Sequence, residues 1–457
     1  MKQLLLRSCL ALSSLFLAVP AESAPQKPVK AFWLSPDWIV ESGVPSPRVL
    51  AGPQVREATV LVLDRLKGLG VNAVLMESWL RGYSLSPVGK LPVYPLTRLS
   101  DGGDMMAILL EEAGKRDIAV HAWVHCLFWR TDNPQLTRPH HEGRTIWDDL
   151  TAAWLREGAA RTTGNVREAA LALAQALTEG KEGLTAEILR QSKIPANEGF
   201  LQAFVPAFRA AGVPPPEWLV QTPEGDIHPS SAKDKWMTLY LNPTSPVVIE
   251  RVTGAIKQIS DAYPGLAGIH LDHIRYPRGM TNVPRDMVAS LKIGHEFAGG
   301  TSGAPYKRWK TLLRERESAV TSFVKGIRAA IRPEHVLSSA VHPLYYFERD
   351  EWPGKLSADD FVSQDWHSWD IDMAMPMIYD SDAARVGRVL KRLRFGLSER
   401  EGGAKPTIVV PGVNLFRLMK ELPAWVYFDF DGLRQIKAGT SPQTAKEEAD
   451  EPSDTMD

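Results

Sequence analysis

The sequence predicts a (β/α)8 TIM barrel, an α/β fold of eight parallel strands that alternate with helices, with a helical insertion after the third strand. Eight short apolar segments with strand character recur along the chain, and amphipathic helical segments separate several of them. The length also agrees, because 457 residues suit one barrel once an insertion of about a hundred residues is set aside.

The expected strands are apolar runs bounded by turn residues. They cover residues 31–35, 72–77, 118–125, 267–272, 336–342, 371–380, 407–412 and 425–429. Between the first three strands, residues 55–69 and 105–115 carry apolar side chains three to four positions apart, which is the spacing of one face of a helix. We therefore expect both segments to be helices of the outer layer.

The insertion covers residues 129–236, far longer than an ordinary connection between a strand and a helix. It contains segments rich in Ala and Leu at 149–161, 167–178, 184–191 and 199–211, which predict helices. Loops that follow barrel strands lie on the catalytic face. The insertion either covers a substrate groove or stabilises the barrel without contacting a ligand.

The two ends of the chain differ from the expected barrel domain, which covers residues 30–435. Residues 1–24 combine Lys2 and Arg7 with an apolar run and then small residues, the pattern of a secretory signal peptide. No apolar run is long enough to predict a transmembrane segment. We expect an exported protein, periplasmic or extracellular after cleavage, with a disordered acidic tail at 440–457.

The overall charge limits the class of partner. The formal net charge is -1 and the pI is about 6.9, so the chain has no basic excess for binding nucleic acid. The content of 44% hydrophobic and 23% charged residues is that of a globular protein. A neutral or weakly charged ligand suits this composition better.

The fourth expected strand ends in the most informative polar group of the sequence. His270 and Asp272 lie two positions apart and so share one face of the strand. A carboxylate at the carboxyl end of a barrel strand occupies the position where such enzymes place catalytic groups. Arg275 follows closely and would keep Asp272 ionised. The alternative is a structural pair in which Asp272 and Arg275 fix a loop.

The second expected strand ends in Glu77, which shares its face with Ala73 and Leu75. Trp79 and Tyr83 follow at once, and their flat apolar faces would suit stacking against a sugar ring. We therefore predict a catalytic acid or base at Glu77 beside a sugar-binding wall. In the alternative, the two aromatic residues only cap the barrel core.

Other strand ends supply further candidates. Asp380 is a second candidate partner for Asp272. The candidates for contact with substrate, besides the aromatic wall, are His121, His270, Arg275, His342, Tyr379 and Asn414. Each of them could instead hold a loop or the core in place.

A metal site requires several ligands close together. His121 and His125 share one strand face with a separation of about 13 Å, too far for one ion, so we expect no metal and no other cofactor. A metal-dependent hydrolase or deacetylase that uses these residues with His270 and Asp272 stays an alternative.

Hydrolysis of a glycosidic bond needs two carboxyl groups, one protonated and the other ionised. The chain offers Asp272 with either Glu77 or Asp380. The separation of the two groups decides between inversion and retention, and the sequence leaves it open.

Several of these segments together resemble a known family. The motifs are 31–34, 66–74, 81–87, 119–124, 240–243, 268–277 and 376–379, and their order resembles that of the bacterial glycosyl-hydrolase-like 10 family. The resemblance covers roughly residues 30–431 without the insertion, and 268–277 is its most specific part. It implies an exported (β/α)8 glycoside hydrolase with Asp272 as the leading catalytic residue.

The sequence therefore predicts an exported glycoside hydrolase that acts on an oligo- or polysaccharide, with bacterial cell-wall glycan as one candidate. The chain departs from the family's pattern near Glu77 and His125 and in its long insertion, so the second carboxylate is not fixed by the resemblance. A barrel that binds glycan without cleaving it is the main alternative from another class.

Overall fold

The computed structural model describes a large part of the chain. It covers residues 28–36, 51–94, 97–131, 145–180, 188, 191–192, 204–221, 227, 238–277, 304–342, 362–378, 386–389, 391, 408–410, 412–413 and 425–427. The expected signal peptide and the expected acidic tail lie outside these residues, and both stay predictions.

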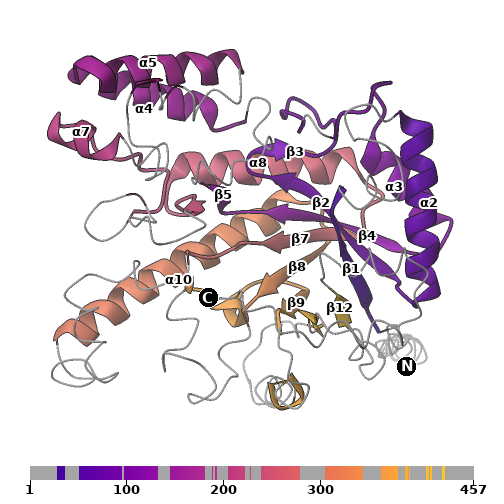
Figure 1. Cartoon of the computed structure of the whole chain (residues 1–457). Helices are drawn as coiled ribbons and strands as arrows, with labels where there is room; N and C mark the ends of the chain where they lie inside the picture. Colours follow the sequence, from indigo (N-terminus) through magenta and orange to yellow (C-terminus); the bar gives the residue numbers. More distant parts are fainter. Residues whose placement is uncertain are drawn as a thin grey trace, which may run out of the picture.

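A parallel sheet forms the centre of the molecule (Figure 1). Its strands are β1 (Lys30–Leu34), β2 (Ala73–Leu80), β4 (Ala119–His125), β7 (Gly268–Asp272), β8 (Val336–Val341), β9 (Met373–Pro376), β10 (Ile408–Val409), β11 (Gly412–Val413) and β12 (Trp425–Tyr427). They are arranged in the order β10-β9-β8-β7-β4-β2-β1-β12-β11, and the short β3 (Tyr83–Ser84) pairs with β2 off this path. The predicted parallel α/β architecture is confirmed, whereas a complete eight-stranded barrel stays a prediction.

Both faces of the sheet are buried, which explains why the strands are almost entirely apolar. Ala31 and Trp33 of β1 pack in an inner cluster with Leu75 of β2. Phe32 and Val74, which alternate with them, pack in an outer cluster with residues of the helices. Side chains alternate between the two faces along a strand. The cluster to which one residue belongs therefore indicates the face of the residues that follow it in the same strand. Ala73 and Leu75, with which Glu77 shares parity, belong to the inner cluster.

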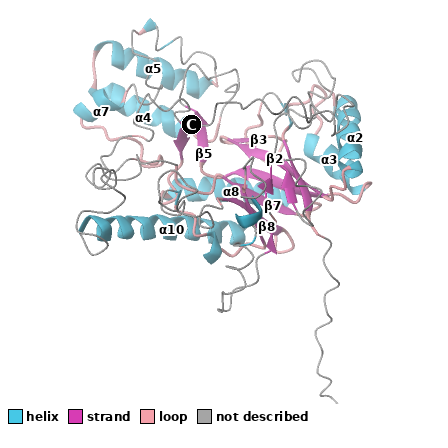
Figure 2. Ribbon diagram, turned by 60° about the horizontal axis from the view of Figure 1, so that its bottom comes forward, coloured by secondary structure: helices cyan, strands magenta, loops and turns pink. Residues whose placement is uncertain are grey.

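The described helices lie outside the sheet (Figures 1 and 2). They include α2 (Gly52–Gly68), α3 (Met105–Gly114), α8 (Pro246–Ala262) and α10 (Ala304–Ala330). α2 begins earlier than the sequence predicts, because Pro53 suits the first turn and the Gln54 side chain accepts a 3.0 Å hydrogen bond from the Ala51 amide. None of the helices in the described segments combines the length and hydropathy needed to cross a membrane.

The insertion contains three of the predicted helices, α4 (Asp148–Arg161), α5 (Gly164–Glu179) and α7 (Val205–Ala210). The fourth predicted helix, at 184–191, lies mostly outside the described residues. The structure adds an element that the sequence did not predict, an antiparallel pair of β5 (Phe128–Thr131) and β6 (Thr238–Tyr240). This pair joins the insertion to the sheet.

The helices of the insertion share one apolar core with the rest of the protein. Leu155 and Phe208 belong to the same buried cluster as Phe32 of β1. Gly158 lets α4 and Phe208 approach closely, because a Cβ atom at this position would lie 2.1 Å from the Phe208 ring. Figure 2 shows α4, α5 and α7 grouped on one side of the sheet.

We predict that Gly158→Ala destabilises the protein by about 1–3 kcal/mol, because the added methyl group overpacks a buried ring. Gly254→Ala in α8 is the matched control, since no atom lies within 4 Å of a Cβ atom there. A better helix former at that position should leave the free energy of unfolding unchanged or raise it by up to about 1 kcal/mol. Urea denaturation of the three proteins measures both effects, and equal stability of the two variants would contradict the packing argument.

Candidate functional site

The carboxyl ends of β2, β4 and β7 place polar side chains on the inner face of the sheet. Glu77 is paired in register with Trp123, and His125 is paired with Asp272. Glu77 follows the inward parity of Ala73 and Leu75, as the sequence predicts. Neighbouring strands lie about 4.8 Å apart, so these ends form one edge with several ionisable groups.

Four residues at this edge form a continuous carboxylate–histidine network, made of Glu77, His125, His273 and Asp272. Glu77 Oε1 lies 2.9 Å from His125 Nε2, and His125 Nδ1 lies 3.0 Å from His273 Nδ1. His273 Nδ1 in turn lies 3.4 Å from Asp272 Oδ1. Two imidazole rings therefore connect the two carboxylates that the sequence selects as catalytic candidates.

Asp272 is oriented through both of its oxygens. The indole N–H of Trp123 donates to Oδ2 at 3.1 Å, and the backbone N–H of His273 donates to Oδ1 at 2.6 Å. Burial by itself would raise the pKa of Asp272, but its interactions with His273, and to a smaller extent with His125 and His270, outweigh it. They hold the pKa well below its usual range, so Asp272 is ionised at neutral pH.

Arg275, which the sequence predicts as the source of this effect, is not among its causes. The Arg275 guanidinium lies over the Tyr240 ring, 5.1 Å from its centroid, and donates to the Tyr276 carbonyl at 3.1 Å. The histidines supply the stabilisation of Asp272 instead. Arg275 therefore contributes to the aromatic surroundings of the site rather than to an ion pair with Asp272.

Glu77 is enclosed more tightly than Asp272. Its side chain is 11% exposed and that of Asp272 is 14% exposed. The Ser35 hydroxyl donates to Glu77 Oε2 at 3.2 Å, while Oε1 faces His125. Both oxygens of the carboxylate are therefore fixed in position.

His273 has a strained backbone, with φ of 50° directly after the end of β7. Non-glycine residues in this region cost about 1–3 kcal/mol and cluster at functional sites. In a regular strand, residue 273 would face away from residue 272. The left-handed turn instead brings the His273 ring back beside Asp272 and His125.

Aromatic side chains from the two strands that flank the insertion pack against the network. Phe128 of β5 lies 4.9 Å from the His273 ring, and Tyr240 of β6 lies 6.4 Å from it, between ring centroids. The guanidinium of Arg81 lies 5.3 Å from the Phe128 centroid. The pair of strands that joins the insertion to the sheet therefore also forms a wall of the candidate site.

His270, predicted to contact substrate, lies in the core instead, with no exposed surface. The Trp33 indole donates to His270 Nε2 at 3.1 Å, so this nitrogen carries no proton and Nδ1 is the donor to the Ser338 hydroxyl at 3.0 Å. Both nitrogens are thus occupied by the protein. Burial lowers the pKa of His270 to about 3, although the charge of Asp272 opposes this shift.

His121 is a second buried histidine of the inner face, with 4% of its surface exposed. Among the described residues, its Nδ1 atom has no hydrogen-bond partner. Burial, followed by the charge of His335, lowers the pKa of His121 to about 4. The structure therefore places both histidines below the edge where a ligand would bind, and a contact with substrate is not supported for either.

The predicted sugar-binding wall at Trp79 and Tyr83 is also corrected. The register between β2 and β4 shifts between Glu77 and Trp79, so the strand bulges and Trp79 turns into the outer core, where it is 1% exposed. Tyr83 is 2% exposed and packs edge-on against Tyr94. The alternative in which both residues serve the core fits the structure.

Four predicted site residues remain, of which the structure describes one, His342. His342 lies at the end of β8, is buried, and its backbone amide donates to the Gln364 side chain at 2.9 Å. Asp380, Tyr379 and Asn414 lie outside the described residues. Their roles stay predictions.

The sequence indicates His125 only as a member of an alternative metal-ligand set, and it does not indicate His273 or Phe128 as site residues. His125 has the inward parity of Trp123, and this signal was present. The position of His273 depends on one backbone torsion, and that of Phe128 on a strand pairing between segments about 110 residues apart. Neither of these features follows from alternation along a strand.

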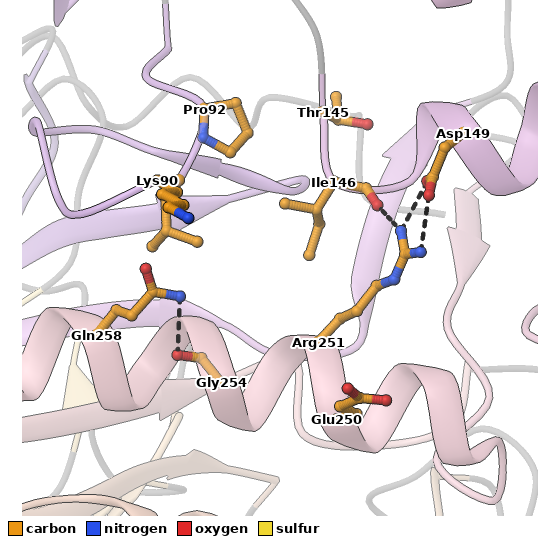
Figure 3. Close-up of a pocket in the computed structure, with 10 residues that line it drawn as sticks. Lys90, Pro92, Thr145, Ile146, Asp149, Glu250, Arg251, Gly254 and Gln258 are labelled. Atoms are coloured by element: carbon orange, nitrogen blue, oxygen red, sulfur yellow. Dashed lines mark hydrogen bonds and ion pairs between the residues drawn. The ribbon is translucent and has the colours of Figure 1, made fainter.

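A separate pocket lies between α8, the segment after β3 and the start of the insertion (Figure 3). Its volume is about 540 Å³, and none of the four network residues lines it. Arg251 donates to both carboxylate oxygens of Asp149, at 2.7 and 2.8 Å, and to the Ile146 carbonyl. Asp149 and Arg251 are therefore engaged with each other, and we place the chemistry at the carboxylate–histidine network, where two carboxylates lie beside histidines.

No family model and no curated protein matches the chain. Solved structures that the chain resembles include a maltogenic α-amylase from Thermotoga neapolitana, with 10% identity, a TM-score of 0.36, and coverage of 85% of this chain and 59% of that one. The chain therefore spans less than two thirds of the length of that enzyme.

Two further solved structures show similarity of the same order. The catalytic domain of a β-amylase from Paenibacillus polymyxa has 10% identity, a TM-score of 0.47, and coverage of 92% of this chain and 96% of that one. An α-galactosidase from Thermus thermophilus in complex with stachyose has 13% identity, a TM-score of 0.29, and coverage of 68% and 40%. These similarities are too weak to assign an activity to the chain.

We predict that the free energy of unfolding falls as the pH is lowered from about 6.5 towards 4. In this range His121 and His270 bind protons in the unfolded chain but not in the folded protein, where they are buried. Their folded pKa values, about 4 and about 3, lie below the ordinary value of 6.5. The contribution of the two neutral histidines to the free energy of unfolding is therefore complete above pH 6.5. It is lost as the pH falls towards their folded pKa values.

Each of these two histidines should contribute a slope of about 1.4 kcal/mol per pH unit within that window. Urea denaturation at pH 7, 6 and 5 measures the slope, and the non-titrating variant His270→Asn should be less stable at pH 7 but should lose less stability on acidification. Identical slopes in the two proteins would contradict this assignment.

Proposed function

We propose that this protein is an exported (β/α)8 glycoside hydrolase, in which Asp272 and Glu77 are the two catalytic carboxyl groups and His125 passes a proton to Glu77. The observation that carries the proposal is the network at the inner edge of the sheet. It contains one carboxylate held ionised and a second one hydrogen-bonded to a histidine. Glycosidic hydrolysis requires two carboxyl groups with separate roles of this kind.

Closure of the sheet into a barrel is supported by the pairing of its end strands. β1 pairs with β12 and β12 with β11, while β10 pairs with β9. A further parallel bridge joins Met377, just after β9, to Gly412 of β11. We propose that β10 and β11 together act as one interrupted strand that closes an eight-stranded barrel. The network then lies at the mouth where barrel enzymes bind substrate.

Asp272 provides the negative charge of the reaction. The transition state of glycosidic cleavage resembles an oxocarbenium ion, so an ionised carboxylate beside the anomeric carbon stabilises it or attacks it as a nucleophile. The hydrogen bonds from Trp123 and from the His273 amide fix the direction of the carboxylate before substrate binds. Such preorganisation lowers the cost of aligning the group during the reaction.

Glu77 and His125 supply the proton. When His125 is protonated, it can pass a proton from Nε2 to Glu77 Oε1 across their 2.9 Å contact. Glu77 then protonates the glycosidic oxygen as the bond to the anomeric carbon breaks, and water supplies the hydroxyl group of the new sugar end. Ser35 keeps the second oxygen of Glu77 in place.

The substrate class follows from the surroundings of the network. The Phe128 ring is partly exposed and adjoins His273. Its flat apolar face could stack against a sugar ring. The near-neutral net charge of -1 suits a neutral or weakly charged glycan. We propose an oligo- or polysaccharide substrate, with bacterial cell-wall glycan as one candidate, and export by the signal peptide expected at residues 1–24.

We predict that Asp272→Asn lowers turnover of a responsive glycan by about 10³-fold or more, because amide replacement removes the charge at the anomeric carbon. Glu77→Gln should lower turnover by about 10²–10⁴-fold for a substrate whose leaving group needs protonation. The measurement is the release of new reducing ends from a panel of oligo- and polysaccharides that includes cell-wall glycan.

Asp261→Asn is the matched control for the first substitution, because Asp261 pairs with Lys257 on the outer face of α8 and its side chain is 50% exposed. It should retain the turnover of the unmodified protein. If Asp272→Asn stays within a few-fold of this control, Asp272 is not catalytic. If no glycan in the panel yields new ends although oligosaccharides bind, the protein is a glycan-binding barrel.

A further inference from the structure

We infer that His125, Asp272 and His273 form a binding site for one divalent transition-metal ion of the zinc class. Each residue offers one ligand atom, and these three atoms all lie within 4.8 Å of one another. The set differs from the His121, His125, His270 and Asp272 set considered from the sequence, because His270 is saturated by Trp33 and Ser338.

The spacing of the ligand atoms suits a small ion. The two Nδ1 atoms of His125 and His273 are 3.0 Å apart, and His273 Nδ1 lies 3.4 Å from Asp272 Oδ1. Ligands bound tetrahedrally at about 2.0–2.1 Å from zinc are separated by about 3.3 Å. Two of the three separations therefore lie within a few tenths of an ångström of the zinc value, and the third is at most 4.8 Å.

The hydrogen bonds leave lone pairs directed to the centre of the cluster. His125 Nε2 faces the Glu77 carboxylate and is its donor, so His125 Nδ1 carries no proton in the neutral ring. The same nitrogen faces His273 Nδ1. A single proton, on His273 Nδ1, thus bridges His125 and Asp272, and a cation can take its place when the ring switches to the other tautomer.

Outer contacts of the kind found around protein metal sites are already present. Glu77 lies behind His125, which reproduces a carboxylate–histidine–metal arrangement. Trp123 donates to Asp272 Oδ2, while Oδ1 accepts the backbone N–H of His273 and keeps a second lone pair for the cluster. The left-handed turn at His273 completes the set, because φ of 50° is what brings its ring to the cluster.

The ligand chemistry selects the class of ion. Two imidazole nitrogens with one carboxylate suit zinc and its neighbours, whereas magnesium and calcium prefer oxygen ligands throughout. The His273 side chain is 27% exposed, so the cluster is reached from solvent. Three protein ligands also leave a fourth position for water or a ligand.

This site has a consequence that rests on the proposed function. An ion bound to Asp272 would occupy the carboxylate that the glycosidase reaction requires, so hydrolysis should fall as the site fills. Ion binding itself does not depend on the glycosidase proposal, and the two can fail separately.

The test measures binding directly, on full-length protein without an affinity tag, treated with chelator and then freed of it. Titration calorimetry with Zn²⁺ should give one ion per chain, and Co²⁺ should give visible absorption bands of a low-coordinate nitrogen and oxygen site. His273→Gly should weaken binding by at least about 100-fold while keeping the fold, because glycine tolerates the positive φ.

Two further variants separate the site from other histidines. Glu77→Gln keeps all three ligands and should weaken Zn²⁺ binding by about 10–100-fold through loss of the outer carboxylate. His367→Gln, on the 3-10 helix Trp366–Ser368, should bind as the unmodified protein does. Absence of binding by the unmodified protein, or equal affinity of His273→Gly and His367→Gln, would overturn the inference.

The inhibitory consequence is read from the same titration with a responsive glycan present. Hydrolysis should decline with the fraction of sites filled and recover when chelator is added. Hydrolysis that rises as Zn²⁺ binds would overturn the competition for Asp272 while leaving the metal site itself supported. A chain that binds Zn²⁺ but cleaves no glycan would support the site and contradict the glycosidase proposal.

Discussion

The contact between the imidazole rings of His125 and His273 is the interaction on which the arrangement of the site depends. It joins the ends of β4 and β7 at 3.0 Å, and through Glu77 it extends to β2. The contact helps to offset the backbone strain of His273, about 1–3 kcal/mol for such a conformation. Without it, the ring beside Asp272 would have no fixed position, and the carboxylate would lose the group that most favours its ionised form.

The sequence predicted the part of this arrangement that alternation along strands controls. The inward direction of Glu77 and the edge position of Asp272 both follow from a period of two residues and from the parallel order of the strands. The same alternation failed at Trp79, because a bulge after Glu77 reverses the side chain's direction. Alternation also gives no information about His273, whose direction is set by a single positive φ.

Long-range pairing limited prediction in a different way. The insertion's helices were recognisable from local periodicity, but the pairing of β5 with β6 joins segments on opposite sides of the insertion in the sequence. Phe128 and Tyr240 reach the network only through that pairing. A sequence pattern can indicate that each segment is apolar, but it does not indicate which distant segment lies beside it.

The pairing of β5 and β6 also bears on how such a chain can change in size. Thr131 and Thr238 lie opposite each other, so the chain returns to the sheet where it left it. A segment with adjacent ends can grow or shrink without displacing the strands on either side, since closing a longer loop costs little extra entropy. The distance between the ends of β4 and β7 is thus independent of the insertion's length, and new material added within 132–237 could remodel the surroundings of the site without altering the register of its strands.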